Sequence, residues 1–258
     1  MHEKLPKSVP STSEEGVTQI SSSSSLQLEV SKENTINHPV LSAKSLGRQV
    51  QNRWVWQGLN FELYPGEGLG IAGPSGAGKS LLLRAIAGLD PVQAGKITFA
   101  DQPLASWSMP HYRSMVIYLH QRPAIMEGTV EENLRQVYTL RSHRDKVYNR
   151  HKILEYLEIL GRRADFLERH SSALSGGEAQ IVAFLRVLQL QPQILLFDEP
   201  TASLDAQTTQ CFEDLVKTWL TKQPKRAYLW TSHDPVQLTR VINRSITISS
   251  DQEISDGK

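Results

Sequence analysis

Residues 73 to 80 have the types and spacing needed to bind a phosphate group. They read GPSGAGKS and match the pattern G-x-x-x-x-G-K-[ST] at every fixed position. The apolar run 69–72 precedes them and the helix-like run 81–87 follows, which is the strand–loop–helix context that this pattern requires. Glycines let the backbone wrap closely around phosphates with its N–H groups pointing inward, and a helix that starts near Lys79 adds its positive end. A glycine-rich turn that precedes a lysine by chance is the weaker interpretation.

Lys79 and Ser80 are the chemically distinctive side chains of this loop. We expect Lys79 to reach the β- and γ-phosphates of a nucleotide, and Ser80 to offer its hydroxyl to Mg²⁺. The loop is therefore predicted to bind ATP together with Mg²⁺. The ATP-contacting residues expected here are Gly73, Pro74, Ser75, Gly76, Ala77, Gly78, Lys79, Ser80 and Leu81.

Two adjacent carboxylates follow an apolar run later in the chain. Residues 194–197 are short and wholly apolar, as in a buried parallel strand, and Asp198 stands at its carboxyl end. Ligands bind at that end of an open α/β sheet, so Asp198 can hold Mg²⁺ through its water shell. Glu199 can then orient an attacking water as a general base. Taken alone, Asp198 and Glu199 would be interpreted as an acidic pair at the N-terminus of a helix. Beside a phosphate-binding loop, the catalytic interpretation is preferred.

A second glycine-rich turn leads into another helix. Ser175, Gly176 and Gly177 precede a segment with apolar residues at helical spacing, namely Ile181, Phe184, Leu185 and Leu188. The turn is therefore a second phosphate-binding shape at a helix N-terminus. One nucleotide does not need two such sites from one subunit. A capping box between Ser175 and Glu178 is also expected and is compatible with this role.

Together these segments resemble the ATP-binding cassette (ABC) ATPases over roughly residues 40 to 250. The motifs that carry the resemblance are LSGGE at 174–178 as the signature, ILLFDEP at 194–200 as the Walker B strand, SLD at 203–205 as the D-loop, Gln121 as the Q-loop glutamine and His233 as the switch histidine. The resemblance implies a head-to-tail dimer, in which each ATP lies between one subunit's P-loop and the other subunit's signature.

The resemblance also implies roles for single residues. The catalytic residues would be Glu199, His233 and Gln121. The metal-binding residues would be Ser80, Gln121 and Asp198. Beyond the P-loop, the expected ATP contacts are Arg48, Ser175, Gly176, Gly177, Glu178 and Asp205.

The fold class expected is α/β, a P-loop NTPase core of the RecA-like type with an antiparallel β-layer and an inserted α-helical subdomain. Apolar runs predict core strands at 69–72, 115–119, 194–197 and 227–231. Segments 40–46 and 53–63 predict the antiparallel layer. The charged segments 131–140, 146–160 and 163–169 predict helices of the inserted subdomain.

The domain boundaries follow from composition. Residues 1–39 are predicted to be a disordered, serine-rich tail, in which the alternating stretch 26–30 is a chance pattern or a short docking segment. Residues 40–250 would form the ABC ATPase domain, with the helical subdomain at about 122–180. Residues 251–258 would form a C-terminal tail.

Composition excludes several classes of protein. The 258 residues carry a formal net charge of +1 and 39% hydrophobic residues, so nothing favours nucleic acid as a partner. The single cysteine, Cys211, rules out an intramolecular disulfide and a cysteine-cluster metal site, and we expect it to be buried in a helix. No apolar run approaches the roughly 18 to 20 residues that span a bilayer. Any role at a membrane would therefore depend on a partner.

Two departures from the family pattern affect the expected contacts. ABC ATPases usually stack an aromatic residue on adenine, but Arg48, Gln49 and Val50 occupy that neighbourhood here. The Arg48 guanidinium could stack instead. Trp54 or Trp56 is the alternative, although both look like strand residues, and on a strand they would share one face. The position after Gln180, often arginine in the family, is Ile181 and could alter a surface interaction.

The function expected is an ATP-binding and ATP-hydrolysing subunit of an ABC transporter. It would dimerise with a second such subunit, as a homodimer, and drive a separate integral-membrane permease from the cytoplasmic face of the plasma membrane. Details of the chain are similar to small bacterial cassettes associated with iron or metal export. The alternative is a soluble ABC ATPase such as an assembly-scaffold or cell-division ATPase. Segment 123–134 would either receive the permease or simply pack beneath the loop, and both interpretations stay open.

Overall fold

The computed structural model describes residues 38–248 together with Asp256 and Gly257. The described chain from residue 38 onward belongs to one compact unit. Most of the tail expected at 1–39, including its stretch 26–30, lies outside the described residues. Two residues of the expected C-terminal tail, in contrast, form the short strand β10 (Asp256–Gly257), which pairs antiparallel with β9 (Arg244–Thr247).

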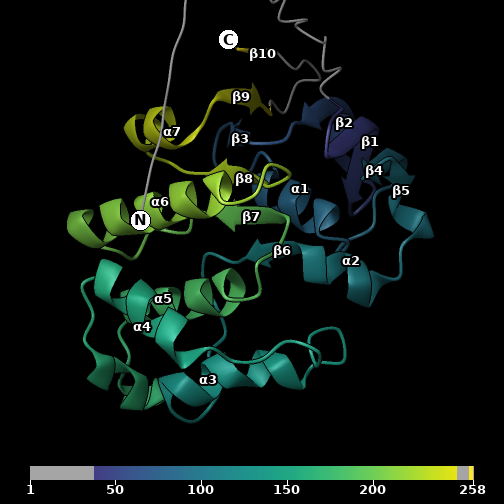
Figure 1. The fold of residues 1–258 in the computed structure, drawn as a ribbon. Coiled ribbons are helices and arrows are strands. Elements are labelled where there is room, and N and C mark those ends of the chain that lie inside the picture. Colours follow the sequence, from purple (N-terminus) through teal and green to yellow (C-terminus); the bar gives the residue numbers. More distant parts are fainter. Residues whose placement is uncertain (1–37, 249–255, 258) are drawn as a thin grey trace, which may run out of the picture. The chain divides into compact units, whose positions relative to one another are not determined.

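A six-stranded sheet forms the centre of this unit (Figure 1). Its strand order is β10-β9-β3-β8-β7-β6, and the five strands from β9 to β6 run parallel. The remaining strands of this sheet are β3 (Gly68–Ala72), β6 (Val116–Leu119), β7 (Ile194–Asp198) and β8 (Ala227–Thr231). The four core strands predicted from apolar runs are all present. Their carboxyl ends meet at one edge, where ligands of such sheets bind.

Alternation along the central strands sends side chains into two separate cores. Ile194 and Leu196 of β7 face the first core, whereas Leu195 and Phe197 face the second. The first core includes helix α1 (Lys79–Ile86) and the antiparallel strands, and the second includes helices α5 (Gly176–Leu188) and α6 (Ala206–Thr221). Because both faces of the sheet are covered, its inner strands β3, β7 and β8 are mostly apolar and buried, as in other parallel sheets.

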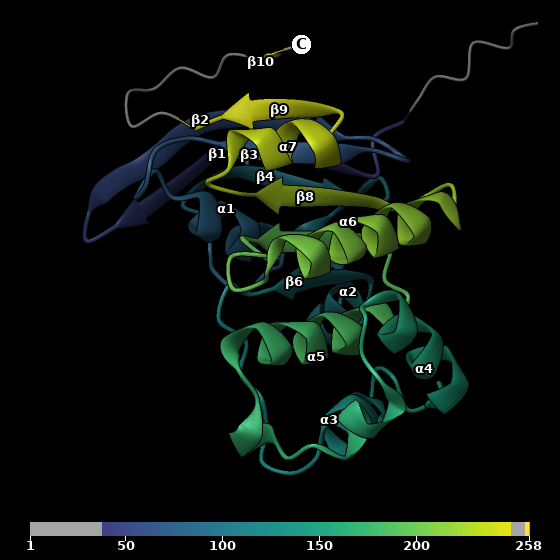
Figure 2. The same ribbon diagram turned by 90° about the vertical axis from the view of Figure 1, so that its left-hand side faces the viewer.

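The antiparallel β-layer has the order β2-β1-β4-β5. Its strands are β1 (Leu41–Val50), β2 (Arg53–Leu63), β4 (Ala94–Phe99) and β5 (Gln102–Pro103). Figure 2 shows β1 and β2 behind and to one side of α1, away from the helices drawn lowest in that view. The P-loop NTPase fold with an added antiparallel layer is therefore confirmed.

The remaining helices are short and lie around the central sheet and below it in the views of Figures 1 and 2. They are α2 (Met109–Met115), α3 (Val130–Gln136), α4 (Arg150–Ile159) and α7 (Pro235–Val241), with 3-10 turns at Leu104–Ser106, Val137–Thr139, Ala164–Glu168 and Ser171–Ala173. The inserted subdomain is less regular than expected. The segment predicted as a helix at 163–169 is a 3-10 turn, and α4 begins only after Asn149, whose side chain accepts a hydrogen bond from the Lys152 N–H.

Cys211 lies on α6, as expected for a helix residue, but it is only half-buried. Its side chain packs at the edge of the second core rather than inside it. In the described ranges 38–248 and 256–257, no helix has the length and apolar character that crossing a bilayer demands.

Candidate functional site

The P-loop joins β3 to α1 through three glycines with positive φ. These angles are 146° at Gly73, 81° at Gly76 and 89° at Gly78. A Cβ added at Gly78 would lie 2.5 Å from Val55 Cγ1 and 2.9 Å from Trp56 Nε1, so both conformation and space require glycine there. The Trp56 indole also donates a long hydrogen bond of 3.4 Å to the Gly78 carbonyl. Strand β2 thus supports the loop from the side of the antiparallel layer.

The Lys79 ammonium lies inside the curve of this loop. It is 7% exposed and donates hydrogen bonds to the Gly73 carbonyl at 2.8 Å and the Pro74 carbonyl at 3.0 Å. Helix α1 begins here with Gly78 as its N-cap, and no side chain accepts its first N–H groups. A positive side chain beside free helix N–H groups is the arrangement that binds an anion such as a polyphosphate.

Three hydroxyl groups hold the Asp198 carboxylate at the end of β7. Oδ1 accepts from Ser80 Oγ at 3.0 Å and from Thr231 Oγ1 at 3.1 Å, and Oδ2 accepts from the Tyr118 hydroxyl at 2.7 Å. Asp198 is 4% exposed, and burial together with this hydrogen bond raises the pKa of Tyr118 far above its usual value. The structure therefore brings Ser80 and Asp198 together as predicted. Tyr118 was missed by sequence reasoning, although a hydroxyl in an apolar strand next to β7 is a detectable signal.

This donor set fits Mg²⁺. Ser80 and Asp198 offer oxygen atoms, which are the ligands that Mg²⁺ prefers, whereas Gln121, the third residue expected at the metal, donates here from its amide nitrogen to Glu199. Within residues 38–248, no group of three or more His, Cys, Asp or Glu side chains is arranged to hold a metal ion. A Mg²⁺ ion at Asp198 would accordingly take several of its ligands from phosphates and water, as is usual for Mg²⁺ bound with a nucleotide.

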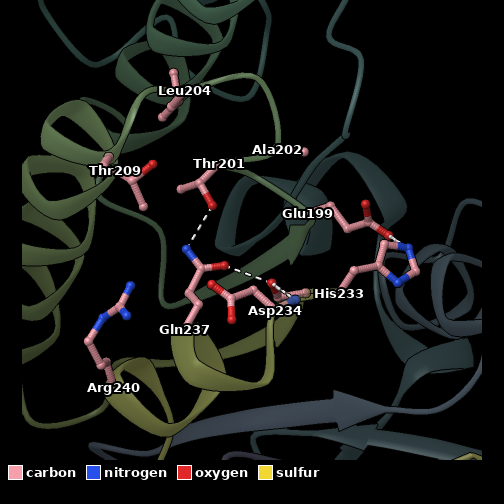
Figure 3. A pocket seen from close by; sticks show the side chains of 11 residues that line it. Glu199, Thr201, Ala202, Leu204, Thr209, His233, Asp234, Gln237 and Arg240 are labelled. Atoms are coloured by element: carbon pink, nitrogen blue, oxygen red, sulfur yellow. Dashed lines mark hydrogen bonds and ion pairs between the residues drawn. The ribbon is translucent and has the colours of Figure 1, made fainter.

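Glu199 is held by the two other residues predicted to be catalytic. Gln121 Nε2 donates to its Oε2 at 2.8 Å, and His233 Nε2 lies 2.7 Å from its Oε1. Figure 3 shows the Glu199 and His233 side chains pointing toward each other. Glu199 has a positive φ of 47°, which is uncommon for a non-glycine residue, and its N–H bonds to Thr231. Such strain is kept where a side chain must be aimed at a site.

A pocket of about 560 Å³ opens beside Glu199 and His233 (Figure 3). In its lining, the buried amide of Gln237 on α7 donates to Thr201 Oγ1 at 2.8 Å and to Glu213 at 3.0 Å, and accepts from Ser232 at 2.7 Å. Glu213 is 1% exposed and also pairs with Arg240. This network anchors the switch segment around His233 to α6 and α7.

The signature turn is built as the sequence predicted. Ser175 caps α5 and forms a capping box with Glu178, whose carboxylate accepts from the Ser175 N–H at 2.9 Å. Glu178 also forms an ion pair with Arg169. A Cβ at Gly177 would lie 2.6 Å from the Ser203 carbonyl oxygen, so glycine is needed where the turn approaches the D-loop. The signature turn thus packs on the D-loop of its own chain, and its hydrogen bonds do not involve the P-loop.

Asp205 and Arg48, two further residues expected to contact ATP, already have partners within the chain. Asp205 caps α6 through a 2.8 Å hydrogen bond from the Thr208 N–H. Arg48 donates from Nη1 to the Pro91 carbonyl at 2.9 Å, so its guanidinium rests on the loop after α1. Its expected contact with adenine stays a prediction. Ile181 is fully buried in the second core, so its replacement of arginine does not create a surface contact.

The expectation that Trp54 and Trp56 share one face is wrong. Arg48 pairs with Trp56 but Gln49 pairs with Trp54, so Val55 is an extra residue in β2. This bulge turns the two indoles to opposite faces of the sheet. Trp56 is 5% exposed beside the P-loop, whereas Trp54 is 40% exposed and lies against Gly47 on the other face.

Comparison with known proteins agrees with this geometry. The model of the family described as ABC transporter matches residues 56–202 of the chain. The chain belongs to the ABC transporter ATPase family. The protein is therefore an ABC ATPase, an ATP-binding subunit of a transporter.

Two curated relatives of this ABC ATPase are transport proteins of opposite direction. One is the "Probable iron export ATP-binding protein FetA" of Escherichia coli, 31% identical over 77% of this chain and 86% of that protein. The other is the "Aliphatic sulfonates import ATP-binding protein SsuB" of Bacillus cereus, 33% identical over 81% of this chain and 79% of that protein. A solved structure titled "Structure of ATP binding subunit of ABC transporter" shares the fold, with a TM-score of 0.74 and 22% identity over 85% of this chain and 90% of that one.

Proposed function

We propose that two copies of this ABC ATPase close head to tail around two Mg²⁺-ATP molecules and so drive a separate membrane permease. The observation that carries the proposal is the presence of two phosphate-binding turns with separate partners. In the P-loop, Ser80 donates a hydrogen bond to Asp198, whereas the signature turn 175–178 packs on Ser203. One nucleotide has no use for both turns, so the signature turn is free to serve the ATP of a second copy.

The roles of the residues follow from their chemistry. The N–H groups of the P-loop and the Lys79 ammonium bind the phosphates, and Ser80, Gln121 and Asp198 hold Mg²⁺. When bound, Mg²⁺ neutralises charge that builds up on the phosphate oxygens. Glu199 orients the attacking water and takes its proton, while His233 contacts the γ-phosphate. For this, the Glu199 carboxylate exchanges at least one of its bonds to Gln121 and His233 for a bond to water.

Segment 123–134 is proposed as the contact with the permease. Its backbone has a defined shape, because Asn133 bonds to both the N–H and the carbonyl of Met126, each at 2.9 Å. Arg186 of the signature helix donates to the Ala124 carbonyl at 2.9 Å. Ile125 packs on the second core, so packing explains that residue, whereas Met126, the next residue, is half-buried and does not belong to either core. A permease seated here would be linked directly to the helix that carries the signature.

The transported substrate is proposed to be iron or another metal, moved outward. The support is the name of the Escherichia coli relative and the resemblance of the chain to iron-export cassettes. With its permease the ATPase would lie on the cytoplasmic face of the plasma membrane. Deleting the gene should then raise cellular iron, measured by elemental analysis. The wild-type gene should return the iron content to normal, whereas the gene with Glu199→Gln should not. Unchanged iron content in the deletion strain would contradict iron as the substrate.

The dimer is tested with Glu199→Gln. Glutamine keeps the size and hydrogen bonding of the side chain but cannot accept a proton. We expect ATP binding to survive, hydrolysis to fall by roughly a hundredfold or more, and an ATP-dependent dimer to appear by light scattering after size exclusion. Asp198→Asn is the matched control, because it weakens Mg²⁺ binding and should not trap a dimer. If Glu199→Gln binds ATP yet stays a monomer with ATP present, the head-to-tail dimer is wrong.

A further inference from the structure

Tyr118 contacts the Asp198 carboxylate on the side away from the P-loop. Its hydroxyl lies 2.7 Å from Oδ2, whereas Ser80 and Thr231 both approach Oδ1, at 3.0 and 3.1 Å. The contact comes from the pairing of β6 with β7, in which Tyr118 lies opposite Leu196, two residues before Asp198. The two carboxylate oxygens of Asp198 therefore have different neighbours, and only one of them faces the loop that binds phosphate.

The chemistry makes Tyr118 the donor in this bond. An ionised carboxylate can only accept hydrogen bonds, so the phenol must donate to it. Hydrogen bonds to charged acceptors are roughly twice as strong as neutral ones, and Asp198 is 4% exposed, so water competes little for it. The Tyr118 ring is also fixed, because it packs on the first core and lies edge-on to His120 with ring centroids 5.7 Å apart. A fixed donor on Oδ2 sets the orientation of the whole carboxylate.

We propose that Tyr118 is a positioning residue for the metal site, which holds Asp198 by Oδ2 so that Oδ1 stays on the side of Ser80 and the Mg²⁺ ion. The inference rests on the proposed role of Ser80 and Asp198 in binding Mg²⁺. Partners that orient a metal-binding side chain in this way typically change metal affinity by about 10- to 100-fold when they are removed. With phenylalanine at this position, Oδ2 would be buried without its donor and the carboxylate could rotate.

The test compares Tyr118→Phe with Tyr112→Phe in the full-length protein. Tyr112, which lies on α2, is the matched control. Its hydroxyl is also buried, but it donates to the Ile86 carbonyl at 2.6 Å and not to Asp198. The probe is Mn²⁺, whose binding to the protein–ADP complex is measured by electron paramagnetic resonance. ADP affinity without metal is measured in parallel by calorimetry with a chelator present.

We expect Tyr118→Phe to weaken Mn²⁺ binding by about tenfold and to leave metal-free ADP affinity unchanged. The Mg²⁺ concentration for half-maximal ATPase activity should rise by a similar factor. Tyr118→Leu, which also removes the ring, should weaken Mn²⁺ binding at least as much, and Tyr112→Phe should bind Mn²⁺ like the wild type.

Two results would overturn the inference. Wild-type Mn²⁺ affinity in Tyr118→Phe would show that the hydroxyl does not orient Asp198. An equal loss of metal-free ADP binding would show that Tyr118 supports the fold of the site in general. Both differ from failure of the proposed function, in which the wild-type protein itself would bind neither ADP nor Mn²⁺ with ADP.

Discussion

Lys79 illustrates how single residues complete this site. Its ammonium is 7% exposed and bonds to the Gly73 and Pro74 carbonyls, so the P-loop holds a positive charge at the place where phosphates are expected. Hydrogen bonds to charged groups contribute about 1.5 to 3 kcal/mol each. The neighbouring glycines supply conformation, but this side chain supplies the charge.

Lys79→Ala should weaken ATP binding by about a hundredfold or more, because the contacts to two phosphates are lost together. Equilibrium binding of a fluorescent ATP analogue measures the change. Lys96→Ala, which removes an exposed lysine from β4, is the control and should bind ATP normally. Wild-type affinity in Lys79→Ala would count against the assignment of the P-loop.

At the scale of elements, helix α5 joins the signature turn to the rest of the chain. Ser175 and Glu178 cap its first turn, and the ion pair with Arg169 fixes the preceding segment. Burial raises the pKa of Glu178, but its bonds to Ser175 and Arg169 outweigh that effect and lower the pKa overall. Glu178 therefore stays ionised near neutral pH and the cap is retained.

Ser175→Arg should leave the protein folded and able to bind ATP but should abolish hydrolysis. Loss of the cap costs about 1 kcal/mol, which a domain of this size tolerates, while the bulky cation blocks close approach to the partner's γ-phosphate. ATP binding and phosphate release are measured on the same sample. Ser142→Arg, which adds the same charge at an exposed loop position in the inserted subdomain, is the control. Normal hydrolysis in Ser175→Arg would contradict the sandwich dimer.

At the scale of the whole compact unit, aromatic rings bind the signature helix to the central sheet. Phe212 of α6 stacks on Phe184 of α5 with ring centroids 3.7 Å apart, and lies 5.8 Å from Phe197 and 5.9 Å from Trp230. All four side chains are fully buried. The second core therefore runs without a break from the inserted subdomain to the sheet.

Phe212→Ala should lower the free energy of unfolding by about 3 to 5 kcal/mol, because it leaves a cavity among these rings. Urea unfolding followed by circular dichroism measures the change. Val236→Ala is the comparison, since Val236 is 64% exposed on α7 and its truncation should change stability by no more than about 0.5 kcal/mol. A loss near that of Val236→Ala would mean that the rings do not hold the layers together.

The sequence alone determined the features that depend on neighbouring residues. Three features each depend on a few consecutive residues, whose spacing and type dictate the local conformation. They are the P-loop 73–80, the strand that ends at Asp198 and the capping box of Ser175. The resemblance of these motifs, in this order, to the ABC ATPases implied the fold class and the grouping of Gln121, Glu199 and His233.

Only the tertiary structure decided the features that depend on how distant segments pair. The register of β6 on β7 brings Tyr118 to Asp198, and the bulge at Val55 turns Trp54 and Trp56 to opposite faces. Cys211 proved half-buried because its place on α6 lies at the edge of the second core. Strand register and helix packing are set by contacts between residues far apart in sequence, and no local pattern records which side chains those contacts will bring together.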